Sequence, residues 1–178
     1  MRADARRNRD QIVRAAVGVF RRCGTGGAMQ QIADAAGLSV GAVYRHFPDR
    51  RALIEHIGSE SLQALNVSSA DALGRIGEAE ITAFDGLVAV LRRCVALPLG
   101  LTHSLIDDDH RDPGLPDLIA RSNGLLLRLI ALAQAEGTLR ADFTPDAILV
   151  GISRVVCAPD VDPEGLEFAV LIDGLRAR

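Results

Sequence analysis

Long apolar runs are missing from this chain of 178 residues. No stretch of about 20 apolar residues could cross a bilayer, and no apolar segment follows the N-terminal arginines as in a secretory signal. These absences predict a cytoplasmic protein without membrane contact. Hydrophobic residues make up 48% and charged residues 24% of the chain, a balance typical of a globular protein that folds along its whole length.

Cysteine and histidine are scarce and scattered. Cys23, Cys94 and Cys157 form no Cys-x-x-Cys pair, so we interpret them as buried, reduced thiols that pack like small hydrophobic side chains. The four histidines lack metal-ligand spacing, and we expect no metal and no cofactor. The stretch Gly-Leu-Ser-Val-Gly at residues 37–41 is similar to a nucleophile elbow, but it follows an expected helix rather than the strand which that motif needs.

Lysine is absent, and all 20 basic residues are arginines, which we attribute to genomic composition. The net charge of −3 hides an uneven distribution. Residues 1–51 hold ten arginines and four acidic residues, a balance of +6, whereas residues 52–178 hold ten and nineteen, a balance of −9. This asymmetry favours a basic N-terminal segment, residues 1–51, that binds a polyanion. Charge alone is equally compatible with arginines that are merely exposed to solvent.

The chain shows no convincing strand pattern and no repeat of fixed period. Apolar residues recur at helical spacing instead, which predicts an all-α fold with about nine helices. Residues 66–80 and 107–116 are predicted as turn or loop because they are rich in polar and acidic residues. The principal expected helices cover residues 6–23, 29–36, 40–47, 50–65, 84–97, 118–136, 145–157 and 163–176, with a short segment at 99–106.

Two of these helices, residues 29–36 and 40–47, are short and separated by three residues. Gly37 suits the left-handed position after a helix, and Ser39 is a good N-cap for the next one. Two short helices joined this way, after a longer supporting helix, are typical of a helix-turn-helix, whose second helix enters the DNA major groove. Val43 and Phe47, four residues apart, are expected to face the core.

The last two helices carry apolar residues on more than one face. Such a pattern has two explanations, burial within the core of the chain or a symmetric interface between subunits. The sequence leaves both open.

The stretches RRNRDQIVRAAVGVF and IADAAGLSVGAVYRHFPDRRALI resemble the N-terminal domain of the TetR/AcrR family of bacterial transcriptional regulators. The resemblance covers about residues 5–55, and the Tyr-Arg-His-Phe-Pro block makes it specific. The remainder resembles the helical C-terminal domain of the family only in outline, with ALAQAEGTLRADFTPDAIL looking like the segment between its seventh and eighth helices.

The resemblance implies a helix-turn-helix DNA-binding domain at residues 1–50 and an all-helical ligand-sensing and dimerisation domain at residues 51–178. It implies a homodimer joined through the last two helices, about residues 145–157 and 163–176. Such a dimer would bind a palindromic double-stranded DNA operator as a repressor in the nucleoid, and an unknown small-molecule effector would release it. The alternatives are a helical small-molecule-binding enzyme with an incidental basic N-terminus, or a DNA-binding protein that answers to a protein partner or to nothing.

The family pattern also implies roles for individual residues. The positions implied to lie in or beside the groove are Ser39, Val40, Gly41, Ala42 and Arg45. Contacts to the DNA backbone are implied for Tyr44, His46 and Arg50. A basic arm is implied for Arg6, Arg7 and Arg9. Arg45 is the one side chain of its helix that could read guanine bidentately. The sequence departs from the family at Gly27 and Ala28, where members usually have a Thr or Ser that caps the second helix.

A ligand pocket is expected among the helices between residues 84 and 135. Its few polar groups are predicted to come from Cys94, His103, Asn123 and Arg128.

Overall fold

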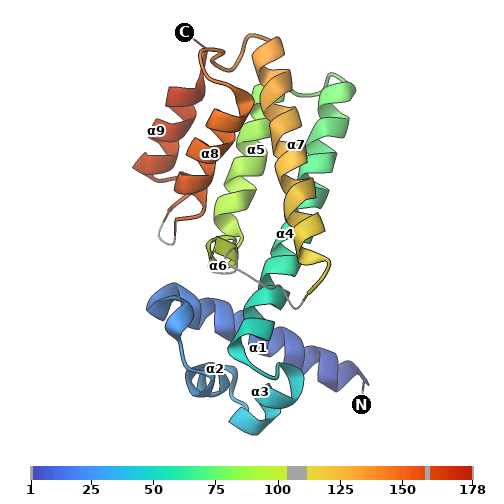
Figure 1. Ribbon diagram of the computed structural model, residues 1–178, viewed down its shortest axis with the longest axis vertical. Helices are drawn as coiled ribbons and strands as arrows, with labels where there is room; N and C mark the ends of the chain where they lie inside the picture. The colour runs from blue at the N-terminus through green and yellow to red at the C-terminus, as the bar shows by residue number, and fades with distance from the viewer. Residues whose placement is uncertain (1, 104–111, 159–160, 178) are drawn as a thin grey trace.

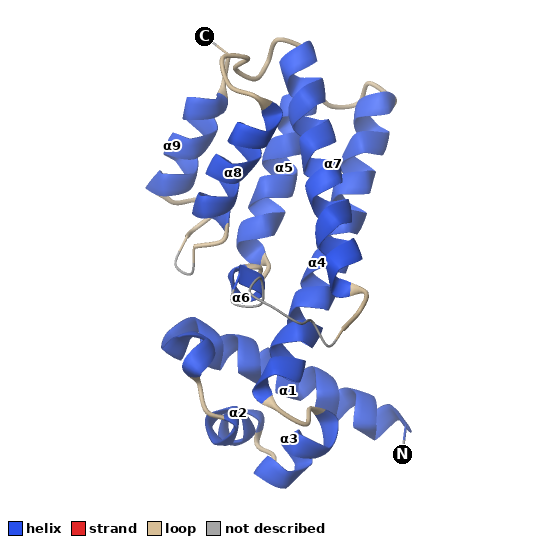
Figure 2. Cartoon of the chain, in the orientation of Figure 1, coloured by secondary structure: helices blue, strands red, loops and turns tan. Residues whose placement is uncertain are grey.

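The computed structural model describes residues 2–103, 112–158 and 161–177, which form nine α-helices and one turn of 3-10 helix (Figure 2). Within these residues there is no strand, and the single β-bridge pairs Leu139 with Arg176. The predicted all-α fold is therefore confirmed. The elements are α1 (Arg2–Cys23), η1 (Gly24–Gly26), α2 (Met29–Ala36), α3 (Val40–His46), α4 (Arg50–Gly77), α5 (Ala83–Ala96), α6 (Gly100–His103), α7 (Leu115–Ala135), α8 (Pro145–Val156) and α9 (Leu166–Leu175).

Helices α1, α2 and α3 form a small head at one end of the molecule (Figure 1). Helix α1 packs on α2, and the two share a core that contains Ile12, Phe20 and Ile32. Helix α1 ends before Gly24, which has a φ of +66°, a conformation that glycine adopts without steric cost. The predicted helix end at Cys23 is confirmed.

The turn between α2 and α3 has the predicted geometry. Gly37 adopts a φ of +63°, and the amide of Leu38 closes the end of α2 by donating to the carbonyl of Ala33 over 3.0 Å. The Ser39 hydroxyl accepts a hydrogen bond from the amide of Ala42 at 3.2 Å, which caps α3.

Helix α4 is longer than predicted. The sequence predicts an end near Leu65 and turns over residues 66–80, but the helix continues to Gly77. Some polar side chains of this segment find partners: the Ser68 hydroxyl donates to the carbonyl of Ala64 at 3.1 Å, and the side-chain oxygen of the buried Asn66 accepts from Ser122 of α7. The Ser69 hydroxyl and Nδ2 of Asn66 are buried without a hydrogen bond to any described residue. Packing of α4 on α5 and α7 thus outweighs weak local helix propensity.

The body of the molecule is built from α4, α5, α7, α8 and α9 (Figure 1). Helix α7 packs against α4, α5 and α8, with Leu129, Ile130 and Ala133 fully buried. By length and composition α7 is also the one helix of the described residues that could cross a membrane, contrary to the expectation of no such span. One face of α7 packs on three neighbouring helices, and 28% of the apolar window is buried within the body.

Helices α8 and α9 lie at one side of the body and divide their apolar residues between the core and solvent. Phe168 and Leu175 of α9 are buried, whereas Leu166 is 78% and Val170 61% exposed. Burial in the core therefore accounts for only part of the apolar pattern of these helices. An apolar face remains uncovered in the single chain.

Candidate DNA-binding surface and ligand cavity

Helix α3 presents one buried and one open face. Val43 is fully buried and Phe47, directly after the helix, is 2% exposed, as the sequence predicts. The remaining residues of α3 lie on the outer side of the head or at its rim. Ser39, Gly41, Tyr44 and Arg45 are exposed, and Val40, Ala42 and His46 are half-buried.

Gly41 lies on the open face of α3 without any close neighbour. A Cβ atom built at this position has no heavy atom within 4 Å. A glycine inside a helix costs about 0.5–1 kcal/mol relative to alanine, so the protein fold gains nothing from it here. Its bare backbone lets this part of α3 approach another surface closely.

Tyr44, Arg45 and His46 form a group of hydrogen-bond donors at the end of α3. The Tyr44 ring is 48% exposed, so the single tyrosine of the chain is not a core residue. Arg45 is exposed beside it. This arrangement can place a phenol, a guanidinium and an imidazole against phosphates and base edges.

The start of α4 adds a further cation to this surface. The Asp49 carboxylate accepts a hydrogen bond from the amide of Ala52 at 2.9 Å and caps the helix, which leaves Arg50 exposed in the first turn. A cation at a helix N-terminus is unfavourable unless an anion meets it. Arg51, in contrast, pairs with Glu55 at 3.0 Å.

The start of α2 lacks the usual cap. Ala28 has no side-chain acceptor, and half of a capping box remains because its amide donates to the Gln31 side chain at 3.0 Å. A Cβ at Gly27 would lie only 2.7 Å from the Val19 side chain. Close packing of this turn on α1 therefore explains the glycine, and any hydroxyl contact to phosphate is lost here.

The N-terminal arginines lie on α1, which is helical from Arg2 onward rather than an extended arm. Arg6 and Arg7 are exposed. Arg9 is half-buried: its guanidinium carbon lies 4.8 Å from the centre of the Phe47 ring, and its Nε donates to Nε2 of His56 at 3.3 Å. Arg9 thus joins α1 to α4 within the protein.

The surroundings of His56 on balance favour its neutral form. Burial lowers its pKa below the ordinary value of 6.5, and the positive charge of Arg9 lowers it further. Glu60, Asp10 and Asp112 act in the opposite direction. A neutral imidazole can accept the hydrogen bond from Arg9, which a protonated one cannot.

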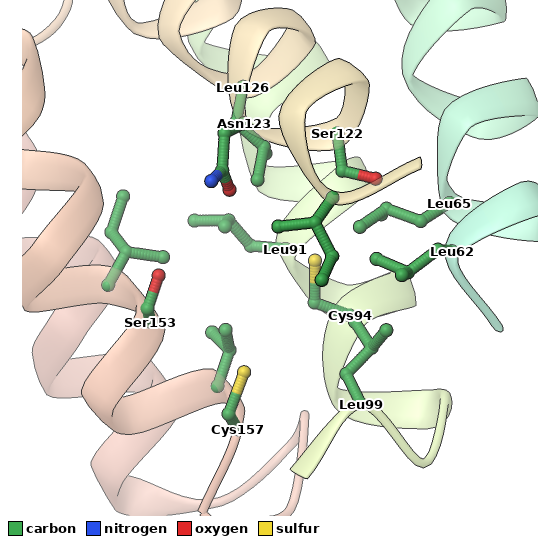
Figure 3. Close-up of a pocket in the computed structure, with 13 residues that line it drawn as sticks. Leu62, Leu65, Leu91, Cys94, Leu99, Ser122, Asn123, Leu126, Ser153 and Cys157 are labelled. Atoms are coloured by element: carbon green, nitrogen blue, oxygen red, sulfur yellow. The ribbon is translucent and has the colours of Figure 1, made fainter. Parts of the chain in front are cut away.

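A cavity of about 200 Å³, here called the inner cavity, lies in the body between α4, α5, α7 and α8 (Figure 3). Its wall is largely apolar, with Leu62 and Leu65 from α4 and Leu91 from α5. The polar groups on the wall are Ser122, Asn123 and Ser153 and the thiols of Cys94 and Cys157. Among the residues that the structure describes, no charged side chain lines the inner cavity, so this wall suits an uncharged ligand with a few hydrogen-bonding groups.

The predicted ligand residues are only partly brought together. Cys94 and Asn123 lie on the wall of the inner cavity. Arg128 is exposed on α7 and is not part of the wall, and His103 belongs to α6 but its side chain lies outside the described part of the structure. Sequence reasoning missed the contributions of α4 and α8, because ordinary leucine and serine residues carry no signal of a cavity.

The three cysteines differ from the prediction in one respect. Cys94 is buried, and burial raises its pKa to about 12; burial also raises the pKa of Cys157. Both are therefore protonated thiols at neutral pH. Cys23 is exposed at the end of α1, so its predicted burial is wrong: Phe20 takes the core side of the last turn, and Cys23 lies with Arg21 and Arg22 on the exposed side. Among the described residues, no group of three His, Cys, Asp or Glu could hold a metal ion.

Comparison with known proteins identifies the head. Residues 12–57 match the model of the bacterial regulatory proteins, tetR family. The TetR transcription regulatory protein of Mycobacterium vanbaalenii is 30% identical over 99% of both chains, with a TM-score of 0.62. A TetR transcriptional regulator of Streptomyces coelicolor is 26% identical over 95% of this chain and 98% of its own, with a TM-score of 0.62.

A γ-butyrolactone receptor shares the fold, with a TM-score of 0.70 and 18% identity over 97% of this chain and 90% of its own. No curated protein matches the chain. The match in the head and the full-length relative agree with the geometry of α2 and α3. The chain therefore belongs to the TetR family of bacterial regulatory proteins and is a DNA-binding transcriptional regulator.

Proposed function

We propose that the protein is a homodimeric repressor that binds a palindromic DNA operator and leaves it when a small molecule occupies the inner cavity. Residues 1–50 would contact DNA, and residues 51–178 would sense the ligand and pair the subunits in the bacterial cytoplasm. The observation that carries the proposal is the open face of α3, with Tyr44 and Arg45 exposed and Val43 buried beneath them.

The proposed contacts divide into two kinds. Arg45 would read a base edge, with Val40, Gly41 and Ala42 against the groove floor, where methyl groups of thymine offer apolar contact. Tyr44, His46 and Arg50, with Ser39 at the start of the helix, would hold the phosphate backbone and set the register. Arg6 and Arg7 are exposed and could add phosphate contacts, whereas Arg9 would act mainly by fixing α1 to α4.

The uncovered face of α8 and α9 supports dimerisation through these helices. An apolar groove of about 350 Å³ runs along them, lined by residues that include Ile148, Gly151, Leu171 and Gly174. Exposed Val170 also lines this groove, and Val150 of α8 is 55% exposed. The same face of a second copy would cover it, since a two-fold symmetric interface uses one patch twice.

The effector would act through α4. This helix carries Arg50 at its first turn and Leu62 and Leu65 on the wall of the inner cavity, without interruption between them. A ligand that binds better to one tilt of α4 than to another must shift the position of the head, and DNA and ligand then oppose each other. The existence of a receptor for a γ-butyrolactone with this fold supports a small-molecule effector.

The alternative of a helical enzyme is not favoured by the family to which the chain belongs. Regulation without a catalytic step is the simpler proposal. The third reading, a response to a protein partner, would leave the inner cavity without a role.

Selection of bound fragments from the source genome by the purified protein tests the proposal. We expect enrichment of fragments with an inverted repeat, and a steep fall in affinity for them with rising salt, because several phosphate contacts release counterions. Failure to enrich any sequence, or an affinity that does not change with salt, would contradict it.

A further inference from the structure

A second cavity lies where the head meets the body. This junction cavity has a volume of about 190 Å³ and is lined by the end of α1, by η1, by α5 and α6 and by the end of α8. Figure 1 shows α6 at the end of the body that faces α1. The cavity is therefore the place where a bound molecule would touch both parts of the protein.

The walls of the junction cavity are mostly apolar. Phe20 contributes from the head, and Val95, Leu97, Leu101 and Val156 contribute from the body. A cavity of this size and lining suits a short hydrocarbon chain or a small ring system.

Two polar side chains, Arg21 and Thr25, also line the junction cavity, and both belong to the head. The Arg21 guanidinium is exposed and donates to the carbonyl of Ala96 over 3.4 Å, the long end of the hydrogen-bond range. Among the residues that the structure describes, no carboxylate lies within 4.0 Å of this guanidinium. Its charge is available to an anion, unlike that of Arg51.

The junction cavity differs from the inner cavity in its charge, although the two have a common wall. Val156 and Cys157 line both cavities, but among the described residues a cationic side chain, Arg21, lines the junction cavity and none lines the inner cavity. The common wall is tightly packed against α6: a Cβ at Gly100 would lie 2.5 Å from the carbonyl oxygen of Cys157. The backbones of α6 and the end of α8 are thus in direct contact.

We propose that the junction cavity is a second ligand site, which binds a small amphipathic monocarboxylate. The carboxylate would pair with the Arg21 guanidinium and accept a hydrogen bond from the Thr25 hydroxyl, and the apolar part would lie along Val95, Leu97 and Leu101. One guanidinium and one hydroxyl match a carboxylate, whereas a phosphate would leave acceptor oxygens without donors. This site goes beyond the proposed function, in which the effector occupies the inner cavity.

A ligand in this site would bridge the head and the body. It would contact α1 through Phe20 and Arg21 and the body through α5 and α6, so its binding favours one orientation of the head over others. Because Val156 and Cys157 form the common wall, a molecule in one cavity would also change the shape of the other. Binding at the two sites would therefore be thermodynamically coupled, and the coupling would be reciprocal.

Calorimetric titration of the full-length protein with octanoate, and with 1-octanol as the uncharged counterpart, tests the proposal. We expect octanoate to bind about tenfold or more tightly than 1-octanol, since the charge-assisted pair is available only to the carboxylate. Arg21→Gln should remove this preference. Arg22→Gln is the matched control, because Arg22 is the adjacent exposed arginine and does not line the cavity.

Two substitutions, each of which fills one of the cavities, show in which cavity octanoate binds. Val95→Phe adds bulk to the junction cavity and should abolish octanoate binding, whereas Leu126→Phe adds bulk to the inner cavity and should change octanoate affinity much less, through the common wall alone. Circular dichroism checks that both variants fold, and Arg21→Gln, at an exposed position, gives the same answer if Val95→Phe does not fold.

The proposal would be overturned if octanoate still binds to Arg21→Gln and Val95→Phe but no longer binds to Leu126→Phe. Octanoate would then occupy the inner cavity. The effector site of the proposed function would still stand in that case. Absence of octanoate binding to the wild-type protein would also overturn it.

Discussion

The Nε atom of Arg9 donates a hydrogen bond to Nε2 of His56 over 3.3 Å, and this contact joins α1 to α4. The ring of Phe47 lies against both partners, 4.8 Å from the Arg9 guanidinium carbon and 5.4 Å from the centre of the imidazole. The head is thereby attached to the first turns of α4 at the residue that follows α3. An arginine implied to contact DNA is in this structure a link within the protein.

This link predicts a pH dependence of stability. Because the pKa of His56 is lower in the folded chain than its ordinary value of 6.5, the unfolded chain takes up the proton first. The contribution of His56 is fully present above that value and is lost as the pH falls through the lower pKa of the folded state. Urea unfolding between about pH 7.5 and about pH 5.5 should show a smaller loss of unfolding free energy in His56→Gln than in the wild type. Equal losses would mean that His56 is not the titrating link.

Arg45→Ala is predicted to lower DNA affinity by about 1–3 kcal/mol, mainly for operators with guanine at one position. The reason is that a bidentate contact to guanine is lost while the phosphate contacts remain. Competition binding with singly substituted operators measures the effect. If the order of preference among these operators is unchanged, another residue reads that base.

Arg50→Ala is predicted to weaken binding to every duplex about equally and to reduce the slope of log affinity against log salt by about 1, because one phosphate contact is lost. Arg121→Ala, which removes an exposed arginine of α7, is the control and should change neither quantity. A salt slope that Arg50→Ala leaves at its wild-type value would place Arg50 away from the phosphates.

Gly41→Ala separates stability from recognition. The added methyl group meets open space in the free protein, so the unfolding free energy should rise by about 0.5–1 kcal/mol. DNA affinity should fall, because the methyl group occupies the gap through which α3 approaches the groove. Gly74→Ala, at an equally open position in α4, should raise stability alone. Unchanged DNA binding by Gly41→Ala would show that this part of the helix does not approach the duplex.

Val170→Asp is predicted to weaken the dimer at least about tenfold, since a charge would be buried without a partner in the proposed interface. Sedimentation equilibrium measures the dissociation constant. Val67→Asp is the matched control, because Val67 is an exposed valine on α4, 72% exposed, outside the α8–α9 groove. A dimer that tolerates Val170→Asp but not Val67→Asp would be formed through another face.

Sequence patterns predicted the head in detail, because its signals are local. Gly37 in the left-handed conformation, Ser39 as a cap and Val43 in the core each follow from the chemistry of one residue and its neighbours within four positions. Asp49 capping the next helix belongs to the same group. Such signals do not depend on how distant parts of the chain pack.

The body was predicted less well, since its features arise from contacts between residues far apart in sequence. Asn66 favours a turn by local propensity, yet the Ser122 hydroxyl lies 2.8 Å from its side chain and the helix continues. The inner cavity is likewise formed by four helices, and Ser153 and Cys157 on its wall lie in and directly after α8, outside the region of residues 84–135 in which the sequence predicts the pocket. No local pattern shows which leucines line a space and which fill one.

Because α4 is unbroken, a tilt of the helix at the inner cavity also moves its first turn. At a rise of 1.5 Å per residue, its 28 residues span about 42 Å, and about 22 Å separate Leu65 at the inner cavity from Arg50. A rotation of about 5° around the cavity would then carry the first turn of the helix through about 2 Å. In the proposed symmetric dimer, equal and opposite movements of the two helix ends would change the distance between them by up to twice this displacement.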